Sequence, residues 1–468
     1  MRKTLKYMLV SLAVPVALVV LLVVAVTAVT GVWYLSADMK QPDVRVDTLA
    51  WPVAAHDGYV ESRGALLRQS DSGLWEAWVQ GAPVERGVAL GRVSRDLLYY
   101  QERVFVDQIR RIVPSDGYLR FLRYLLIGFN RHLGESVTEE FRKEIYGVSL
   151  SCTREFDAIG TPYERQLNYH AAHDIGHTMQ EYMLVGCSSF AAWGGTSADS
   201  MLIVGRNFDF WVGDDFARNR VIALYAPDAG YRFASVTWPG MAGVLSGMNE
   251  RGLTVTINAA KGTPPTASAT PISLLAREIL QYAATIDEAV AIAARRRTFV
   301  SESLLIGSAA EGCAAIIEKT PRLMALHSPA PGDEFIICTN HFQSPELADD
   351  KHNVENIASS DSPWRWRRLA ELIPAETIDP VRAADILRDS LGVGGTPLPA
   401  HDPRRIAQPF AHHSVIFKPA ELLMWVSTGM GHGGEYVCYD LGRIFASPTP
   451  PDFSTEIRTE SLTIPAER

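Results

Sequence analysis

Apolar and polar positions divide the chain into an unbroken apolar stretch, a group of helical patterns and a long series of strand patterns. Residues 7–35 contain no charged side chain. From 94 to about 181, apolar residues recur at spacings of three and four, which is typical of amphipathic helices. After residue 187, short apolar segments alternate with turn residues, which predicts strands. We therefore expect a helical region followed by a strand-rich region.

The segment between the apolar stretch and the helical patterns predicts a strand or a hairpin. Within residues 59–93, apolar and polar residues alternate in the second half, and Gly81, Pro83 and Gly87 supply turn signals. The last helical pattern begins at Pro162, a residue suited to the first turn of a helix. This helix is expected to lead the chain directly to the start of the strand-rich region.

Helical patterns interrupt the strand-rich region twice. Strands are expected at 188–195, 200–212, 221–227, 231–240, 242–249, 252–260, 302–309, 313–320, 323–328, 334–342, 413–419 and 421–428, and helices at 272–296, 364–373 and 379–391. This order predicts an α+β fold in which helices pack outside one or two antiparallel sheets. The polar, Pro-rich end of the chain predicts a loosely attached tail.

The first apolar stretch is long enough to cross ~30 Å of hydrocarbon as a helix. Three basic residues lie among the first six, so the positive-inside rule predicts a cytoplasmic N-terminus and an exported remainder, either periplasmic or extracellular. Trp33 and Tyr34 would lie at the far interface of the cytoplasmic membrane. The alternative is a cleaved signal peptide, whose apolar core usually has only ~7 to 15 residues. The greater length favours a retained single-pass anchor.

These patterns divide the chain into an anchor, a linker, a mainly helical segment, a catalytic segment and a flexible tail, with expected boundaries of 1–36, 37–58, 59–186, 187–446 and 447–468. The formal net charge of −9 argues against a nucleic-acid partner, which would require a basic face. The five cysteines form no C-x-x-C pair, so neither a zinc ribbon nor a disulfide framework is indicated. We expect no cofactor.

One cysteine has an unusual sequence context. Cys187 follows Gly186 and precedes two serines. A thiol next to an unhindered glycyl carbonyl can attack that carbonyl, accept the acyl group and release a free amine after hydrolysis. The new α-amino group would have an ordinary pKa of ~7.7 to 8.0 and the thiol one of ~8.5, so the amine suits the role of base for its own side chain. We therefore expect Cys187 to become a new chain end and to act as a nucleophile.

The motifs GCSSFAAWG and GRNFDF resemble those of the N-terminal-nucleophile cysteine hydrolases of the penicillin acyltransferase (acyl-coenzyme A:6-aminopenicillanate acyltransferase) type, which are related to bile salt hydrolase and acid ceramidase. The likeness extends from about Leu74 to Leu441 and includes APVERGVALG and FKPAELLMWV. The resemblance implies an αββα sandwich, here preceded by a helical segment and a single transmembrane helix. It also implies maturation by cleavage before the cysteine.

The same resemblance implies roles for individual residues. Cys187 would be the nucleophile, and the cut would separate it from Gly186. The aspartate of GRNFDF would hold the new α-amino group, and the asparagine of TNHF would donate to the oxyanion. The full set of implied site residues is Cys187, Arg206, Asp209, Asn258, Asn340 and Arg365. Neighbouring Arg367 and Arg368 leave the register of the last arginine open.

Plainer interpretations exist for these residues. Arg206 and Asp209 could form an ion pair at a strand end, which is common and weakly stabilising. Asn258 and Asn340 could be turn residues that bond the local backbone. The shared order with Cys187 favours the site interpretation.

A helical face offers a different kind of site. His170, His173 and His177 lie at i, i+3 and i+7, and Asp174 is a neighbour, so a metal ion could bind there. The sequence contains no H-E-x-x-H motif, and histidines in helices are often polar core or interface residues. The histidines could instead promote cleavage at the cysteine that follows.

Two further patterns point to less favoured alternatives. His412 and His413 precede a strand and could form a Cys–His dyad, but the papain-type sequence around the thiol is missing. GMGHGG, at 429–434, fits G-x-G-x-x-G, but no helix is predicted after it, so a loop is expected there.

The sequence therefore predicts a membrane-anchored, self-cleaving hydrolase or acyltransferase that attacks amide or thioester bonds through a thioester on Cys187. Its expected partners are an acylated small molecule, the membrane and its own cleaved fragment. The anchor favours a lipophilic acyl group. The alternative is a membrane-tethered binding or assembly protein that retains the fold without turnover.

Overall fold

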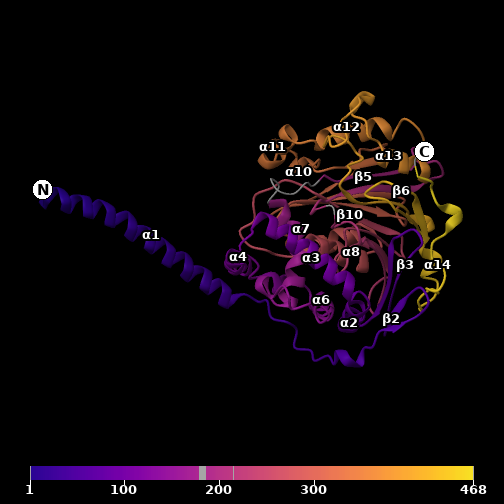
Figure 1. Ribbon diagram of the computed structural model, residues 1–468. Helices are drawn as coiled ribbons and strands as arrows, with labels where there is room; N and C mark the ends of the chain where they lie inside the picture. Colours follow the sequence, from indigo (N-terminus) through magenta and orange to yellow (C-terminus); the bar gives the residue numbers. More distant parts are fainter. Residues whose placement is uncertain (1, 179–185, 214, 467–468) are drawn as a thin grey trace.

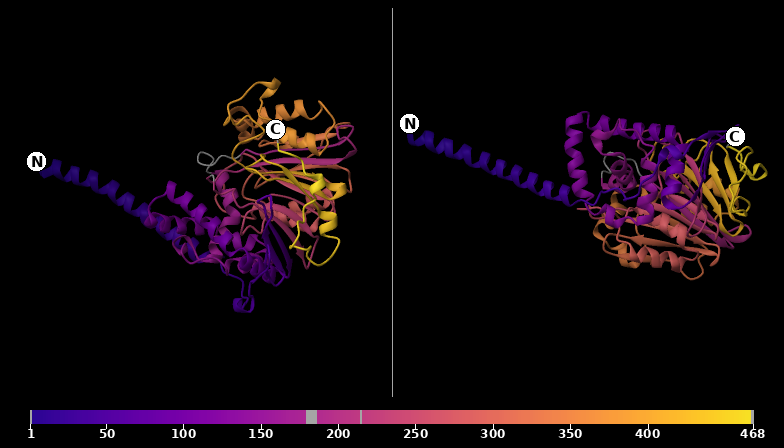
Figure 2. Two further views of the ribbon diagram at one scale, coloured as in Figure 1. Left: turned by 45° about the vertical axis from the view of Figure 1, so that its right-hand side comes forward. Right: turned by 90° about the horizontal axis from the view of Figure 1, so that it is seen from below.

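Two β-sheets lie face to face at the centre of the fold, and helices cover their outer faces (Figures 1 and 2). The computed structural model describes residues 2–178, 186–213 and 215–466. The larger sheet has the order β1-β2-β3-β4-β7-β8-β9-β10-β11-β12-β13, and the smaller has the order β14-β5-β6-β15-β16-β17. The expectation of an α+β fold is confirmed.

The strands of the larger sheet are β1 (Ala54–Ala55), β2 (Val60–Ser62), β3 (Ala65–Gln69), β4 (Trp75–Gly81), β7 (Val221–Pro227), β8 (Phe233–Thr237), β9 (Ser246–Asn249), β10 (Leu253–Ala259), β11 (Glu302–Ser308), β12 (Cys313–Lys319) and β13 (Met324–His327). The strands of the smaller sheet are β5 (Ser188–Gly194), β6 (Ser200–Asp209), β14 (Phe335–Cys338), β15 (Ala411–Lys418), β16 (Leu423–Ser427) and β17 (Tyr436–Asp440).

Each sheet is buried on both faces, which explains the nearly continuous apolar runs in its strands. On β6, Leu202 and Val204 point into the core between the sheets, whereas Ile203 points into the core on the other side. Strand β7 shows the same alternation: Leu224 points into the core between the sheets, and Tyr225 points into the core on the other face of the larger sheet. Successive side chains of a strand point to opposite faces, so two apolar cores require apolar residues at every position.

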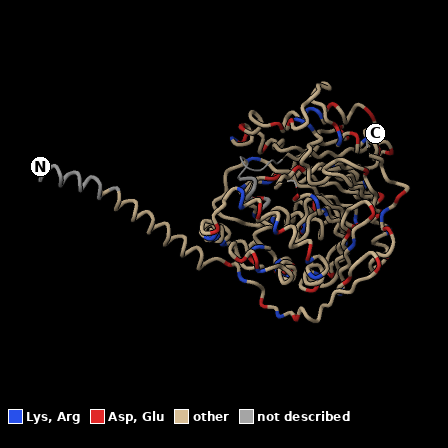
Figure 3. The backbone as a smooth tube through the Cα atoms, viewed as in Figure 1, with Lys and Arg blue, Asp and Glu red and all other residues tan. Residues whose placement is uncertain are grey.

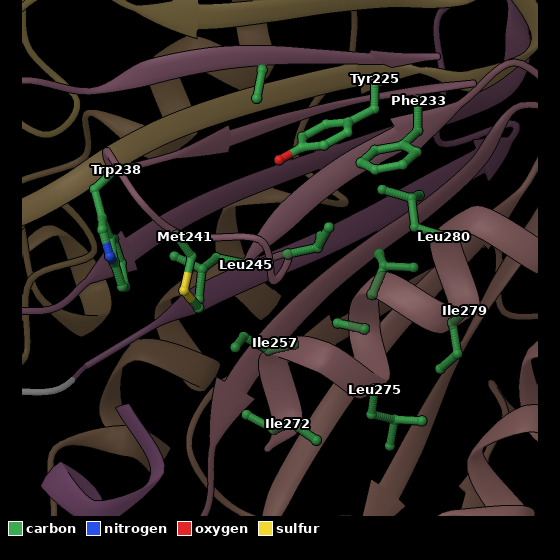
Figure 4. Packing of buried hydrophobic residues seen from close by; sticks show 14 of the residues in the cluster. Tyr225, Phe233, Trp238, Met241, Leu245, Ile257, Ile272, Leu275, Ile279 and Leu280 are labelled. Atoms are coloured by element: carbon green, nitrogen blue, oxygen red, sulfur yellow. The ribbon is translucent and has the colours of Figure 1, made fainter. Parts of the chain in front are cut away.

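Helices complete an αββα order of layers. Helices α8 (Ile272–Tyr282) and α9 (Ile286–Arg295) cover the larger sheet, and α12 (Ser362–Leu372) and α13 (Pro380–Leu387) cover the smaller one. Figure 4 shows side chains of α8 packed against Tyr225 and Phe233 of the larger sheet. The single helix expected at 272–296 is divided by Thr285, whose hydroxyl caps the N-terminus of α9.

The region before Cys187 contributes both helices and strands. Its helices after the N-terminal one are α2 (Pro83–Val93), α3 (Arg95–Ile112), α4 (Asp116–Phe129), α5 (Leu133–Ser136), α6 (Glu139–Ser149) and α7 (Pro162–Thr178). Its strands β1 to β4 extend the larger sheet, and β4 pairs in parallel with β7. The sheet therefore contains strands from both sides of position 187.

Buried charges also join the two regions. Arg86 of α2 donates to Glu144 of α6 over 2.6 Å, and Arg277 of α8 lies 3.2 Å from the same carboxylate. All three side chains are buried. Breaking a buried charge network by removing one partner typically costs ~3–5 kcal/mol, so this cluster holds the helical region firmly on α8.

Helix α2 differs from the expected strand or hairpin. Gly87, interpreted as a turn residue, lies inside the helix, where it lets α2 approach α6 closely. A Cβ atom at Gly87 would lie 2.1 Å from the carbonyl oxygen of Glu144, and Gly147 on α6 faces α2 in the same way. Pro83 begins the helix instead of ending a strand. The glycines serve helix packing here, a use that the local sequence does not distinguish from a turn.

The N-terminal helix α1 (Arg2–Ser36) extends away from the rest of the molecule (Figures 1 and 2). Its residues 16–36 form an apolar segment with no buried part, long enough to cross a membrane. A signal sequence near an N-terminus has the same properties. Figure 3 shows charged residues distributed over the globular part, while residues 16–36 of α1 carry none.

The end of the chain is attached more firmly than expected for a flexible tail. Phe453, Ile457 and Ile464 are buried, and Ile464 exchanges backbone hydrogen bonds with Tyr436 of β17. The apolar residues are widely spaced among polar ones, which conceals the attachment in the sequence. Strand β17 itself was not expected; it forms a hairpin with β16 across the GMGHGG turn.

We expect Gly87→Ala to destabilise the protein by about 1–3 kcal/mol, because the new methyl group would overpack the backbone contact between α2 and α6. Gly117→Ala is the matched control on α4, where an added Cβ meets only the Ser115 hydroxyl at 3.8 Å. That change should be neutral or stabilising by up to ~1 kcal/mol. Thermal unfolding of both variants measures the difference. Equal melting temperatures would contradict the close approach of the two helices.

Candidate active site

Cys187 lies immediately before β5, and the pairing of β5 with β6 brings the GRNFDF motif back beside it. Ser189 is paired with Arg206 and Ser188 with Asn207 in this antiparallel register. The Cys187 thiol is buried and accepts hydrogen bonds from the Arg206 guanidinium, at 3.7 Å, and from the backbone N–H of Asp209. Burial raises the pKa of the thiol, and the Arg206 charge opposes that rise.

Arg206 connects the thiol to the other sheet. Its Nη1 donates to the Leu245 carbonyl over 2.6 Å and to the Ser246 hydroxyl, and its Nη2 donates to the Ile257 carbonyl. The guanidinium also lies 4.6 Å from the centroid of the Phe208 ring. Burial lowers the pKa of Arg206. These acceptors and the aromatic ring replace the water that a buried guanidinium loses.

A chain of neutral groups continues from Arg206. The Ser246 hydroxyl, which accepts from Arg206, also forms a hydrogen bond with His413 Nε2, 2.8 Å away. His413 Nδ1 lies 2.9 Å from His412 Nδ1, so one of these two nitrogens donates to the other. Burial lowers the pKa of His412 to about 3 and that of His413 well below its ordinary value. Both rings are therefore neutral near pH 7.

This arrangement argues against the Cys–His dyad. Ser246 and Arg206 stand between His413 and the Cys187 thiol. The ring of His412 packs instead against Trp238 and Phe216. The two histidines therefore belong to the support of Arg206, not to a pair with the thiol.

Asp209 is a buried carboxylate without a hydrogen-bond partner among the described residues. Burial raises its pKa well above the ordinary value, while the charges of Arg365 and Arg206 oppose that rise. Its carbonyl accepts from the Gly186 N–H over 3.2 Å. A Cβ atom built on Gly186 would lie 3.7 Å from Asp209 Oδ2. The carboxylate thus lies beside the Gly186–Cys187 junction.

Arg365 of α12 reaches the same junction. Its Nη1 donates to the Cys187 carbonyl over 2.5 Å, and its Nη2 donates to Asn340 Oδ1 over 2.8 Å. Its Nε donates to Asp361 over 3.0 Å. The neighbouring arginines lie elsewhere: Arg367 over the Trp364 ring, and Arg368 against Asp389.

The two asparagines differ in their surroundings. Asn340 donates from Nδ2 to the Ala259 carbonyl over 2.8 Å, and Arg365 fixes the orientation of its amide. One hydrogen of that NH2 group is available for another acceptor. Asn258 is fully buried, donates to the Cys338 carbonyl over 3.1 Å and accepts from Ser189 over 2.9 Å. Asn258 therefore joins β10 to Ser189 and Cys338 of the smaller sheet.

Sequence reasoning missed the supporting groups Asp361 and Ser246. Asp361 lies one turn before Arg365, a helical spacing that could have indicated the pair. Ser246 carries no such signal, because its contact with Arg206 depends on how the two sheets face each other.

Of the three histidines on α7, the structure describes the side chain of His170. His170 Nδ1 lies 2.7 Å from the Gln166 carbonyl, and His170 Nε2 accepts from the Ala242 N–H over 2.9 Å. Both ring nitrogens are thus occupied. The side chains of His173 and His177 lie outside what the structure describes. Within the described residues, no group of three or more His, Cys, Asp or Glu side chains could hold a metal ion.

Replacing His412 should reduce the pH dependence of stability. A histidine of ordinary pKa ~6.5 in the unfolded chain gains a proton there as pH falls, whereas buried His412 stays neutral. The stabilisation that neutral His412 gives the folded state is complete above pH ~6.5. This stabilisation declines by about 2 kcal/mol between about pH 7 and about pH 5. We expect melting temperatures of the His412→Gln variant to fall less over this range than those of the unmodified protein. Identical pH slopes would contradict a neutral, buried His412.

Parts of this sequence are similar to those of known proteins. Residues 196–402 match the family model described as acyl-coenzyme A:6-aminopenicillanic acid acyl-transferase. This range begins after Cys187 and contains the other implied side chains of the site. A protein of Archaeoglobus fulgidus, described as uncharacterized, is 24% identical over 357 residues, which are 68% of this chain and 56% of that protein. The chain thus spans little more than half the length of that relative.

Three solved structures were also matched. An N-acylethanolamine-hydrolyzing acid amidase orthologue of Caenorhabditis elegans is 16% identical, with 50% of this chain and 93% of that chain covered and a TM-score of 0.37. Penicillin V acylase of Agrobacterium tumefaciens is 16% identical, with 56% of this chain and 88% of that chain covered and a TM-score of 0.35. A mutant of the conjugated bile acid hydrolase of Clostridium perfringens is 13% identical, with 58% of this chain and 95% of that chain covered and a TM-score of 0.38.

The family match spans parts of the sheet and helix layers described above. It covers both sheets in part, the two helices on the larger sheet and the helix that carries Arg365. Residues 196–402 therefore match the model of the acyl-coenzyme A:6-aminopenicillanic acid acyl-transferase family, and the resemblance read from the sequence motifs is confirmed over this range.

Proposed function

We propose that this protein is a self-processing N-terminal-nucleophile hydrolase or acyltransferase whose nucleophile is Cys187. The observation that carries the proposal is the buried carboxylate of Asp209, which lacks a hydrogen-bond partner among the described residues and lies beside the Gly186–Cys187 junction. A buried carboxylate without a partner is costly. A positively charged α-amino group on Cys187 would supply that partner.

Cleavage would create this group. The Cys187 sulfur attacks the Gly186 carbonyl carbon, the peptide C–N bond breaks, and the acyl group moves to sulfur while the nitrogen gains a proton. Water then hydrolyses the thioester and leaves a carboxylate on Gly186 and a free amine and thiol on Cys187. The αββα order of layers supports this assignment, because the resemblance implies the same order for relatives that mature in this way.

The mature residue would contain both nucleophile and base. The α-amino group has an ordinary pKa of ~7.7 to 8.0, so a useful fraction is neutral near neutral pH and can take the thiol proton. Asp209 would hold this amine in place, and Arg206 would stabilise the thiolate from the other side. The thiolate would then attack the substrate carbonyl and form a thioester.

Asn340 is suited to stabilising the oxyanion of that step. Its carboxamide oxygen is held by Arg365, and one of its N–H groups points to the Ala259 carbonyl. The second N–H can donate to the negative oxygen that develops during attack. Arg365 is therefore a positioning residue that orders Asn340 and the Cys187 carbonyl together.

We propose an acylated small molecule as the substrate, with transfer of the acyl group to water or to an amine. The family match supports acyl transfer. A cavity next to the apolar cluster that contains Cys187 is lined by aromatic residues, among them Phe210 and Trp238, and by the polar side chains of Gln101, Glu102 and Gln166. The aromatic part of this lining supports an apolar acyl group.

We also propose that α1 remains in the protein as a single-pass anchor of the cytoplasmic membrane, with the catalytic region outside. Its length, its composition and its extension away from the globular part support this assignment. After cleavage the anchored fragment would keep the second fragment bound. Pairing of β4 with β7 and the cluster of Arg86, Glu144 and Arg277 supports this.

Self-processing is tested by intact mass and N-terminal sequencing of the detergent-purified protein. We expect two co-purifying fragments, the second beginning Cys-Ser-Ser-Phe, because the thiol at Cys187 performs the cut. The Cys187→Ala variant should yield one uncut chain. Cys438→Ala removes another buried thiol and should leave the cut unchanged. A single uncut chain from the unmodified protein would contradict the proposal and favour a binding protein on the same fold.

We expect Arg365→Lys to reduce turnover by about 10²-fold, because a lysine cannot bridge the Cys187 carbonyl and Asn340, and small misplacements of reacting groups cost that much. Arg367→Lys is the matched control, on the same helix but stacked on Trp364. Release of an acyl group from a panel of N-acyl amines gives kcat for both variants. Equal rates for the two would refute a positioning role for Arg365.

A further inference from the structure

Helix α4 presents large apolar and aromatic side chains to the surface. Tyr118, Phe121, Tyr124 and Leu125 are exposed by 52%, 51%, 46% and 39%. Their spacing places them along one side of the helix. The opposite side faces the protein through buried residues, among them Ile127. An exposed row of this kind generally marks an interaction surface.

The outer face of α4, defined by these four residues, lies next to the end of α1. The rings of Tyr34 and Tyr124 are 5.2 Å apart. Trp33 lies against Gly128, and Arg131 is 4.7 Å from the centroid of the Trp33 ring. In Figure 1, α4 is seen nearly end-on beside the end of α1. The right-hand view of Figure 2 shows it running across the direction of α1.

This arrangement fixes the depth of α4 relative to α1. Trp and Tyr residues at the end of a membrane span usually lie at the level of the lipid headgroups. If α1 crosses the bilayer, contact between Tyr34 and Tyr124 places the outer face of α4 at that same level. A helix that runs across the span then lies along the membrane plane.

The charges around α4 are compatible with this position. Arg120 of α4 is exposed, and its long side chain can extend to lipid phosphates. Arg110 lies within 4.0 Å of Asp107 and 3.6 Å from Asp116, so its charge is partly balanced. Tyrosines suit an interfacial helix, because the ring enters the acyl boundary while the hydroxyl stays hydrated.

We propose that the outer face of α4 inserts into the lipid bilayer interface beside α1, so that the protein contacts the membrane at two places. One transmembrane helix alone leaves the globular part free to rotate and tilt. A second contact, held against the first by the aromatic pair, fixes the orientation of the globular part above the membrane. This inference rests on α1 as a membrane span, which belongs to the proposed function.

The test is photocrosslinking of the full chain in vesicles of phosphatidylcholine and phosphatidylglycerol. The photoreactive residue p-benzoyl-L-phenylalanine replaces Phe121 in one variant, Leu22 of α1 in a second and Val381 of α13 in a third. Leu22 and Val381 are also exposed, and α13 lies far from α1 in Figure 1. Mass spectrometry measures the fraction of each variant that carries a lipid adduct.

We expect lipid adducts at positions 22 and 121 in severalfold excess over position 381. Adducts at position 22 together with only background at position 121 would overturn the proposal while leaving the anchor intact. Background at all three positions would overturn the anchor and the α4 contact together. Crosslinks from position 121 to a second copy of the chain, in place of lipid, would show that a protein covers this face. Cleavage before Cys187 and turnover are measured separately, so their failure is distinguishable from each of these results.

Discussion

The position of the Arg206 guanidinium between the two sheets governs the geometry of the whole site. It belongs to the smaller sheet, yet it donates to backbone carbonyls and a hydroxyl of the larger sheet and to the Cys187 thiol. A buried guanidinium tolerates little displacement, because every lost acceptor leaves a desolvated donor. The place of the thiol and the contacts of Ser246 with His413 therefore depend on a single buried charge and the acceptors that surround it.

Much of the fold could be predicted from local patterns. The strands around GRNFDF and the helices before Cys187 have apolar periodicities that depend only on neighbouring residues. Helix α2 could not be recognised, because Gly87 and Gly147 serve a contact between two helices and resemble turn residues in isolation. The tail was misjudged for a related reason: its few buried side chains are separated by polar residues, and its pairing partner, Tyr436, lies outside the segment.

The candidate site shows a similar division. Cys187 and Asp209 are indicated by motifs close together in the sequence, and the pairing of β5 with β6 explains why they meet. Arg365 lies far away along the chain, and only the fold distinguishes it from the adjacent arginines. Ser246 and His413 could not be assigned from the sequence, since their roles depend on the stacking of one sheet on the other. Chemistry that depends on register between distant strands is the part that a single sequence does not reveal.

The parallel pairing of β4 with β7 has a consequence for how the protein can fold and refold. A chain cut before Cys187 would keep its native structure, because strands from both pieces lie inside one sheet. Unfolding would then separate two polypeptides, and recovery would require them to meet again in the correct order. If the chain is cut there, folding has to be completed before the cut, and each molecule would have one opportunity to fold.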